Sequence, residues 1–330
     1  MKTQIEKTSK ADTLLKCSII LFVLSLIVCL TSNAKGQSVD SISPYQNEIV
    51  KMVDQTVERN YTAFPAFGHV EPTLFERSFC PHRYLKTRNE RIMLDMAFQI
   101  TIRMLNLRSS PIRTPDYSPS ATVYALLNKN SDNSTLFGFL TLAHHSNGQD
   151  GSFYNEDGSV NLKDGNFSTN FIKAGFTKSV AFFNGKTKSF YSCSFEQHLN
   201  IDRNVELNGT YGFSRLHFDF KSREVSINTS KTSDKRTHYL RFSINNTFIT
   251  DQITKTKLGD LSKRLICSAK LYYRNAALKN FSVFIQAYQG QDYYNIQFVN
   301  NISFIRAGIC CEPASILASR KSKTNSKNNI

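Results

Sequence analysis

"RLICSAKLYY", residues 264–273, shows the pattern that decides the fold of this chain. Every second position from Leu265 to Tyr273 is apolar or weakly polar, while the positions between them include Ser268 and Lys270. Successive side chains of a strand point to opposite faces, so the stretch predicts a strand with one apolar and one charged face. In a soluble sandwich the apolar face would be the core, whereas in a membrane barrel it meets lipid and the charged face lines the interior.

Comparable segments follow one another from about residue 90 to residue 310. Each is roughly ten residues long, and clusters of Asn, Gly, Asp and Ser separate them. They include "TLFGFLTLAHHS", "YGFSRLHFDF" and "FSVFIQAYQG", none of which shows a sustained helical period. No apolar stretch in this region is long enough for a membrane-spanning helix.

The N-terminus has the composition of a secretory leader. Lysines precede an apolar run at residues 17–30, and small residues follow it near Ala34 and Gly36. This predicts a cleaved signal peptide at residues 1–36, and the alternative is a single anchor helix. The leader, the strand lengths and the long polar loops together favour an all-β, antiparallel transmembrane β-barrel over residues 90–310 rather than a sandwich.

The remaining segments are assigned from composition. Residues 37–89 are predicted to form a partly irregular N-terminal segment in which "YQNEIVKMVDQTV" indicates a short helix. Residues 311–330 are predicted to form a basic, disordered tail. The net charge of +15 over 330 residues favours anionic partners such as phospholipid headgroups, and no nucleic-acid-binding motif is present. The cysteines lack the spacing of a disulfide framework or a metal site.

A candidate reaction centre lies in "TLAHHSNGQDGSFYN", residues 141–155. On a strand, His144 and Ser146 share one face at the end of an apolar stripe, and His145 points to the other face. A hydroxyl beside an imidazole is the arrangement of a nucleophile and its base. If the stripe meets lipid, only a lipid or detergent-like substrate would reach the pair. The alternative is an ordinary strand end that is rich in turn-forming residues.

A base of this kind needs a third group to hold its ring. The next predicted strand, "GNFSTNFIKAGF" at residues 165–176, places Asn170 where an antiparallel neighbour of His144 would lie. A neutral amide can orient an imidazole as a carboxylate does. The backbone N–H of Gly148 is a candidate donor to an oxyanion.

This arrangement resembles the active site of the outer-membrane phospholipase A family. The resemblance covers about residues 90 to 310 and keeps the family's order. The matching stretches are "SSPIRTPDYSP" at residues 109–119, His144-x-Ser146-Asn147-Gly148, Ser168-x-Asn170, and "VFIQAYQGQDYYN" at residues 283–295.

The resemblance implies a barrel of about twelve strands, within a range of about ten to twelve. It also implies a calcium-dependent hydrolase that removes acyl chains from phospholipids and is activated by dimerisation. In this family pattern Ser146 is the nucleophile, His144 the base and Asn170 the orienting residue. Gly148 contributes to the oxyanion hole.

The calcium ligands are also implied by the resemblance. They are the backbone carbonyl of Gln149, a serine of the following loop, which is Ser152, and Ser109 from the partner subunit. Ser159 is a second candidate for the loop serine, and acidic residues of the loop offer harder oxygen ligands. These acids are Asp150, Asp157 and Asp164, and they are also compatible with a solvated loop.

The sequence therefore predicts a phospholipase of the bacterial outer membrane, a carboxylic ester hydrolase of the A1/A2 type. Its predicted partners are phospholipid substrate, the membrane, calcium and a second copy of the chain, with no nucleic acid. One alternative is a non-enzymatic barrel, either a pore or a structural protein with a decayed site. The other is a secreted soluble β-sandwich that binds anionic ligands.

Overall fold

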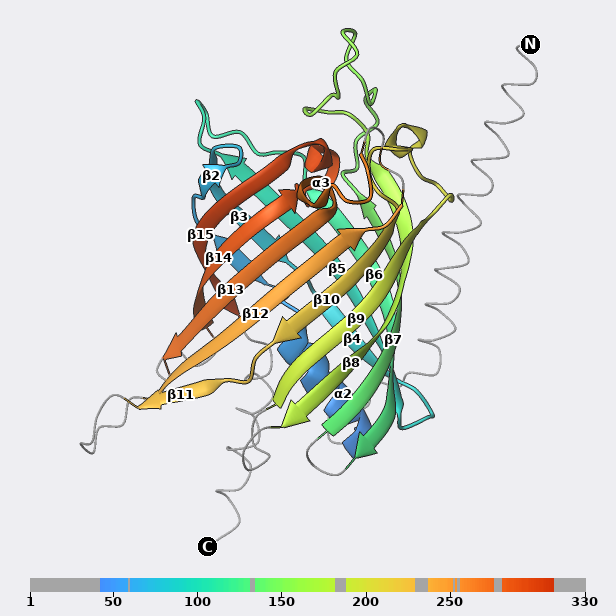
Figure 1. The fold of residues 1–330 in the computed structure, drawn as a ribbon, viewed down its shortest axis with the longest axis vertical. Helices are drawn as coiled ribbons and strands as arrows, with labels where there is room; N and C mark the ends of the chain where they lie inside the picture. Colours follow the sequence, from blue (N-terminus) through green and yellow to red (C-terminus); the bar gives the residue numbers. More distant parts are fainter. Residues whose placement is uncertain are drawn as a thin grey trace, which may run out of the picture. The chain divides into compact units, whose positions relative to one another are not determined.

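A single antiparallel sheet forms the body of the protein. The computed structural model describes residues 42–311 except 59, 131–133, 182–187, 229–236, 252, 254–255 and 276–280. The sheet closes on itself because β1 (Tyr61–Ala63) pairs with both β3 (Thr73–Phe79) and β15 (Asn301–Cys311). Figure 1 shows the tilted strands of the wall. The chain is therefore a closed antiparallel barrel, which confirms the predicted fold class.

Twelve strands make up the wall of the barrel, because three of them are divided into two consecutive segments. The divided strands are β1 with β2 (Phe67–His69), β3 with β4 (His82–Lys86), and β10 (Ser214–Lys221) with β11 (Val225–Asn228). Both segments of each pair lie along the same neighbouring strand. The undivided strands are β5 (Ile92–Leu105), β6 (Asp116–Asn130), β7 (Ser134–Ser146), β8 (Ser168–Ala181), β9 (Lys188–Leu199), β12 (Thr237–Ile249), β13 (Leu265–Asn275), β14 (Phe281–Gln291) and β15.

The wall begins earlier in the chain than predicted from the sequence. Strand pairing starts at Tyr61, whereas the barrel was expected from residue 90. The two early wall strands are short segments interrupted next to Pro65 and Pro81. Proline has no backbone N–H for the ladder, so these strands lack the continuous alternation of the later ones. The predicted signal peptide, and the predicted tail beyond Cys311, lie outside the described residues.

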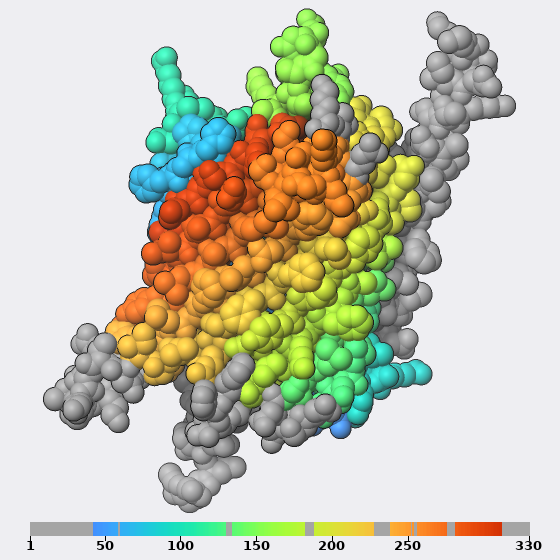
Figure 2. Space-filling model, viewed as in Figure 1, coloured from blue at the N-terminus to red at the C-terminus, as the bar shows by residue number. Residues whose placement is uncertain are grey.

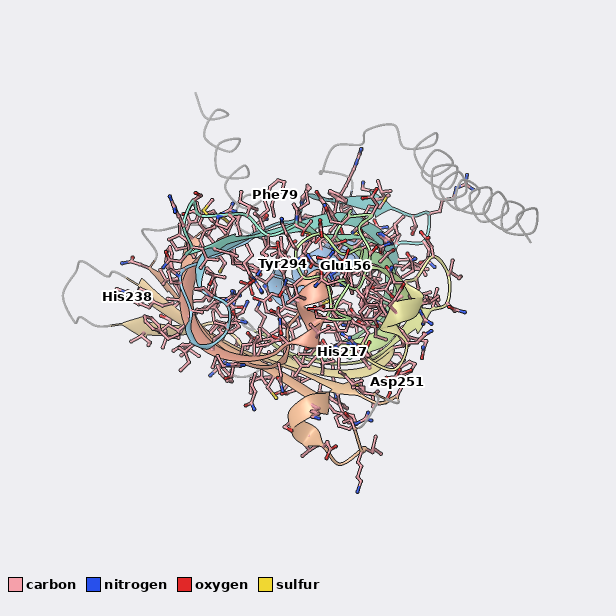
Figure 3. All side chains as sticks on the ribbon, turned by 90° about the horizontal axis from the view of Figure 1, so that it is seen from above. Phe79, Glu156, His217, His238, Asp251 and Tyr294 are labelled. Atoms are coloured by element: carbon pink, nitrogen blue, oxygen red, sulfur yellow. The ribbon has the colours of Figure 1, made fainter. Side chains whose placement is uncertain are left out.

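The apolar face of the strands is the outside of the barrel. In β13, Leu271 and Tyr273 are 46% and 40% exposed, while Lys270 and Tyr272, which alternate with them, are buried. The view from above in Figure 3 places Phe79 outside the ring of strands and Tyr294 within it. On the face seen in Figure 2, side chains of β10, β12, β13 and β14 form a continuous wall. The apolar exterior is the surface that a membrane barrel presents to lipid.

The two ends of the barrel differ in the length of their connections. One end carries the segments 106–115, 147–167, 200–213, 250–264 and 292–300, and the other carries the short turn 87–91. Bacterial barrels have long extracellular loops and short periplasmic turns, so the end with the long segments is the outer end. These segments include the short helices η2 (Val205–Leu207), α3 (Leu261–Arg264) and η4 (Asn295–Val299).

The outer mouth of the barrel is filled by its own loops. Apolar side chains from three loops pack there into one buried cluster, which we call the mouth cluster. It consists of Phe153, Phe167, Leu207, Tyr211, Ile296 and Phe298. Because η4 contributes two of these residues, the β14–β15 loop folds into the outer mouth of the lumen.

The inner half of the lumen holds α2 (Pro44–Thr56), which confirms the short helix predicted near residue 45. Its apolar residues Ile49 and Val53 are fully buried, and its pale blue ribbon lies inside the ring of strands in Figure 3. The side-chain amide of Gln46 donates to carbonyl groups at the β4–β5 turn, among them that of Ile92 at 3.1 Å. No helix of the described residues has the length and apolar character needed to cross a membrane.

Charged side chains in the lumen are paired with one another. Arg103 contacts Glu76 at 3.0 Å, Asp292 at 2.9 Å and Glu71 at 3.0 Å. Arg306 makes a second contact with Glu76 at 3.0 Å. An unpaired charge at this depth would carry a large desolvation cost, so the network holds β3, β5, β15 and the β14–β15 loop in one arrangement.

Candidate active site

The outer end of β7 carries two of the predicted site residues on the lipid-facing surface. Leu140 and Leu142 are each about half exposed on that surface. Because side chains alternate along a strand, His144 and Ser146 continue the same face to the last residue of β7. His145 points into the barrel. The apolar stripe thus ends in an imidazole and a hydroxyl at the outer boundary of the membrane.

The third predicted residue lies on the neighbouring strand. In the β7–β8 register His144 is opposite Asn170, and Ser146 is opposite Ser168. The Nδ1 atom of His144 is 2.9 Å from Oδ1 of Asn170. The structure therefore brings His144 and Asn170 into contact, as the sequence predicted for a base and its orienting group.

The orientation of the Asn170 amide decides which nitrogen of His144 carries the proton. Its Nδ2 group donates to the backbone carbonyl of Ile201 at 2.8 Å, which leaves Oδ1 facing the imidazole. An amide oxygen only accepts hydrogen bonds, so Nδ1 of His144 must donate to it. The other ring nitrogen, Nε2, is then unprotonated in the neutral ring, and this is the tautomer that a general base requires.

Ser146 is placed beside this pair but not yet bonded to it. Within the described part of the chain, its hydroxyl makes no hydrogen bond to His144. The two side chains are separated by one inward-facing residue on the same strand. In free enzymes the hydrogen bonds of catalytic groups are often long and shorten when substrate binds, so the arrangement is compatible with a nucleophile and base.

The turn after Ser146 is held by a buried asparagine. The side chain of Asn147 is 1% exposed, accepts a hydrogen bond from the N–H of Phe167 at 3.0 Å and donates to the carbonyl of Gly165 at 2.8 Å. Gly148 follows with φ of +66°. A Cβ atom there would lie 3.2 Å from the ring of Tyr117, so both the backbone angle and the available space favour glycine at the predicted oxyanion position.

The predicted calcium ligands lie on two separate outer loops. Gln149 and Ser152 follow Gly148 in the 147–167 segment, and Ser109 lies in the 106–115 segment with φ of +67°. Among the described residues no group of three or more His, Cys, Asp or Glu side chains is arranged to hold a metal. The predicted set consists instead of a carbonyl and hydroxyl groups, and these oxygen donors fit the preference of calcium.

Three of the four alternative loop ligands form hydrogen bonds within the loop. Asp157 Oδ1 accepts hydrogen bonds from the hydroxyl and the N–H of Ser159, at 2.6 and 2.9 Å, and these bonds lower the pKa of the Asp157 carboxyl. Asp164 Oδ1 accepts from Asn161 at 2.6 Å. Asp150 is exposed and lies next to Gln149. Of the three acids, Asp150 is the one that could join Gln149 without breaking one of these bonds.

Several contacts inside the barrel were not identified from the sequence. Nε2 of His145 is 2.6 Å from Oδ1 of Asp116, and the same oxygen accepts the N–H of Asn295 at 3.0 Å. The ring of His145 packs edge-on against Phe167, with centroids 4.9 Å apart. These contacts tie the end of β7 to the loops of the barrel mouth, so the strand that carries His144 is anchored from within.

The carbonyls that hold Asn170 were also missed. They belong to Ile201 and Asp202, which lie more than thirty positions along the chain from Asn170. Backbone acceptors in a distant loop have no signature in the sequence. Asp116 is different, because it falls within the quoted stretch at residues 109–119 and could have been singled out there.

A polar cavity of about 400 Å³ lies in the lumen behind β7. Its walls include His198, whose ring nitrogens lie 3.0 Å from Glu196 and 2.9 Å from Thr169. These contacts join β8 to β9 and face the lumen. The cavity is therefore on the opposite side of the wall from His144 and Ser146.

The closed twelve-stranded wall and its apolar exterior define the class of this protein. They are the architecture of bacterial outer-membrane β-barrels, and the predicted outer-membrane location is confirmed with the fold.

Solved structures of similar fold are outer-membrane phospholipases A. The Escherichia coli enzyme aligns with 80% of this chain and 96% of its own, at 14% identity and a TM-score of 0.52. A calcium-bound dimer from Salmonella typhi aligns with 78% of this chain and 91% of its own, at 12% identity and a TM-score of 0.52. No family model and no curated protein matches the sequence. At these identities the likeness extends to the fold, and the roles of individual residues stay predictions.

Proposed function

We propose that the protein is a calcium-dependent outer-membrane phospholipase, an A1/A2-type carboxylic ester hydrolase. The observation that carries the proposal is the 2.9 Å contact between His144 and Asn170 on the lipid-facing surface, with Ser146 on the same face two positions along β7.

The proposed chemistry is acyl transfer through the Ser146 hydroxyl. Ser146 Oγ attacks the ester carbonyl while Nε2 of His144 takes its proton. His144 then gives this proton to the departing lysophospholipid alcohol, and an acyl-serine ester remains. A water molecule, deprotonated by the same nitrogen, attacks that ester and releases the fatty acid. Asn170 holds the ring in the required tautomer throughout.

The position of the pair selects the substrate class. Leu140 and Leu142 lead along the barrel exterior to His144 and are about half exposed. An acyl chain lying along this stripe would bring its ester to the outer end of β7, where the hydrocarbon region gives way to headgroups. A water-soluble ester would gain nothing from this approach.

Calcium and a second copy of the chain complete the proposed site. Gln149 and Ser152 would bind the ion from one copy and Ser109 from the other. When bound, calcium would polarise the ester carbonyl and stabilise negative charge on its oxygen. The N–H of Gly148 would donate to the same oxygen. The active form is accordingly proposed to be a homodimer.

The proposal is tested by hydrolysis of phosphatidylcholine in mixed micelles. Ser146→Ala is expected to remove fatty-acid release because the nucleophilic oxygen is lost. Ser303→Ala is the matched control, since Ser303 also lies on the outward face near the outer end of its strand, where it is exposed. Equal hydrolysis by the wild type and Ser146→Ala, with both proteins folded, would favour the non-enzymatic barrel.

Calcium dependence is tested in the same assay. Chelation is expected to suppress hydrolysis, and added calcium, rather than magnesium, is expected to restore it because the proposed oxygen ligands suit the larger ion. If chelation leaves hydrolysis unchanged, the proposed serine mechanism stands and the proposed role of calcium is wrong.

A further inference from the structure

The loop that follows β9 lies against the outward face of β8 at the candidate site. Asn170 Nδ2 donates to the carbonyl of Ile201 at 2.8 Å and has a longer contact, 3.3 Å, with the carbonyl of Asp202. The hydroxyl of Ser168 donates to the same Asp202 carbonyl at 3.1 Å. The N–H of Asn204 in turn donates to the carbonyl of Ser168 at 3.0 Å. One short turn is therefore bonded to both β8 residues that face the predicted base and nucleophile.

This turn depends on an unusual backbone angle. Asp202 has φ of +46°, in the left-handed region that residues other than glycine rarely adopt. Asp and Asn tolerate it best, and β-branched residues tolerate it least. Residues held in such conformations concentrate where the surrounding structure needs the geometry. Here the angle directs two successive carbonyls, those of Ile201 and Asp202, toward the amide of Asn170.

The direction of these carbonyls fixes the direction of the amide. With Nδ2 bonded to the turn, Asn170 presents its oxygen to Nδ1 of His144. If the amide turned over, its N–H would face Nδ1, which would then have to accept. The proton of the neutral ring would move to Nε2, the atom that must receive the proton of Ser146. A reversed amide thus gives a base that is already protonated.

We propose that Asp202 is a positioning residue of the candidate site, acting through its left-handed backbone to hold Asn170 and hence the tautomer of His144. This inference rests on the proposed function for its kinetic consequence, but its structural consequence is independent of catalysis. The contacts of Asp202 with Asn170 and Ser168 come from its backbone carbonyl and not from its carboxylate.

The test is a substitution series at one position. Asp202→Asn and Asp202→Gly keep access to the left-handed region and should retain wild-type activity on phosphatidylcholine. Asp202→Val disfavours that region and should lower kcat by about 10- to 100-fold, the usual size of an effect on a residue that orients a reactive group, with KM unchanged. Gly209→Val is the matched control, because Gly209 has φ of +70° in the same loop but makes none of the contacts to Asn170 or Ser168.

A second readout does not depend on activity. The ¹⁵N shifts of His144 report which ring nitrogen is protonated, and Asp202→Val should move the proton from Nδ1 toward Nε2 while Asp202→Asn should not. The inference is overturned if Asp202→Val retains both kcat and tautomer, or if Asn and Gly reduce kcat as strongly as Val does. If instead Ser146→Ala hydrolyses lipid like the wild type, the proposed function fails, and the ¹⁵N spectra still decide the role of Asp202.

Discussion

The adjacent residues His144 and His145 have different surroundings because successive side chains of β7 point to opposite faces of the sheet. His144 faces lipid and contacts Asn170, whereas His145 faces the lumen and contacts Asp116. The outward residue can be altered without opening a cavity in the barrel. The inward residue, His145, joins the wall to the loop at the mouth. Its loss would remove one of the contacts that compensate for burying the Asp116 carboxylate.

Alanine substitutions at the two histidines should therefore separate stability from chemistry. His144→Ala is expected to abolish ester hydrolysis and to change the free energy of unfolding little. His145→Ala is expected to lower that free energy by roughly 1–3 kcal/mol, because the buried Asp116 carboxylate loses one of the two groups that contact its Oδ1 atom and keeps the N–H of Asn295. Urea unfolding in lipid vesicles and the micelle assay measure the two effects. A His145→Ala protein that is inactive but fully stable would contradict this division.

The faces of these residues could be predicted from the sequence, but their supports could not. Alternation alone places His144 and Ser146 outward, and antiparallel pairing brings Asn170 beside the ring. The carbonyls of Ile201 and Asp202 belong to the loop that follows β9, the next strand after the one that carries Asn170. Any residue can supply a carbonyl, so its position follows only from the folded path of the chain.

Elements of the barrel could be predicted where their alternation is continuous. β14 alternates between exposed and buried side chains from Phe281 to Gly290, and β13 does so from Lys270 to Tyr273. Both were predicted as strands, and the faces of β13 were assigned from the sequence. The strands before residue 90 are interrupted next to Pro65 and Pro81, and they were not predicted from the sequence. The helix at residues 44–56 was predicted, but its position inside the lumen was not. The sequence of a helix does not indicate which distant strands it packs against.

The carboxylate of Glu58 ties the segment after α2 to the wall. Glu58 forms an ion pair with Lys270 and accepts a hydrogen bond from the hydroxyl of Tyr272 at 3.1 Å. Burial alone would raise the pKa of Glu58. The positive charge of Lys270 and these hydrogen bonds have the opposite and larger effect, so the pKa of Glu58 lies below its usual value of 4.5. The folded state therefore favours the ionised form.

This lowered pKa predicts a loss of stability in acid. A carboxyl whose folded pKa is depressed stabilises the fold fully above its unfolded pKa, and the contribution disappears as the pH falls through the folded value. Glu58→Gln should cost roughly 3 kcal/mol near neutral pH by leaving Lys270 without its partner. Below about pH 4 the difference between the wild type and this variant should shrink. Unfolding temperatures measured across this range would contradict the assignment if the difference stayed constant.

The barrel as a whole is filled at both ends. The mouth cluster occupies the outer end, and α2 occupies the inner half with Ile49 and Val53 fully buried. Between them lie cavities of about 400 and 280 Å³, and Asn245 lines both. An enzyme that acts at its outer surface has no need of an open lumen, whereas a pore requires one.

Conductance in planar bilayers should therefore distinguish the proposed phospholipase from the alternative pore. The wild type is expected to show no steady conductance steps. Deleting residues 44–57 alone should open only the inner end, and deleting residues 295–299 alone only the outer end, so each variant should stay closed. The double deletion should conduct, provided that it keeps the altered mobility of a folded barrel in unheated gels. Steady steps from the wild type, combined with unchanged lipid composition in the presence of calcium, would favour a pore and leave His144 and Ser146 without a catalytic role.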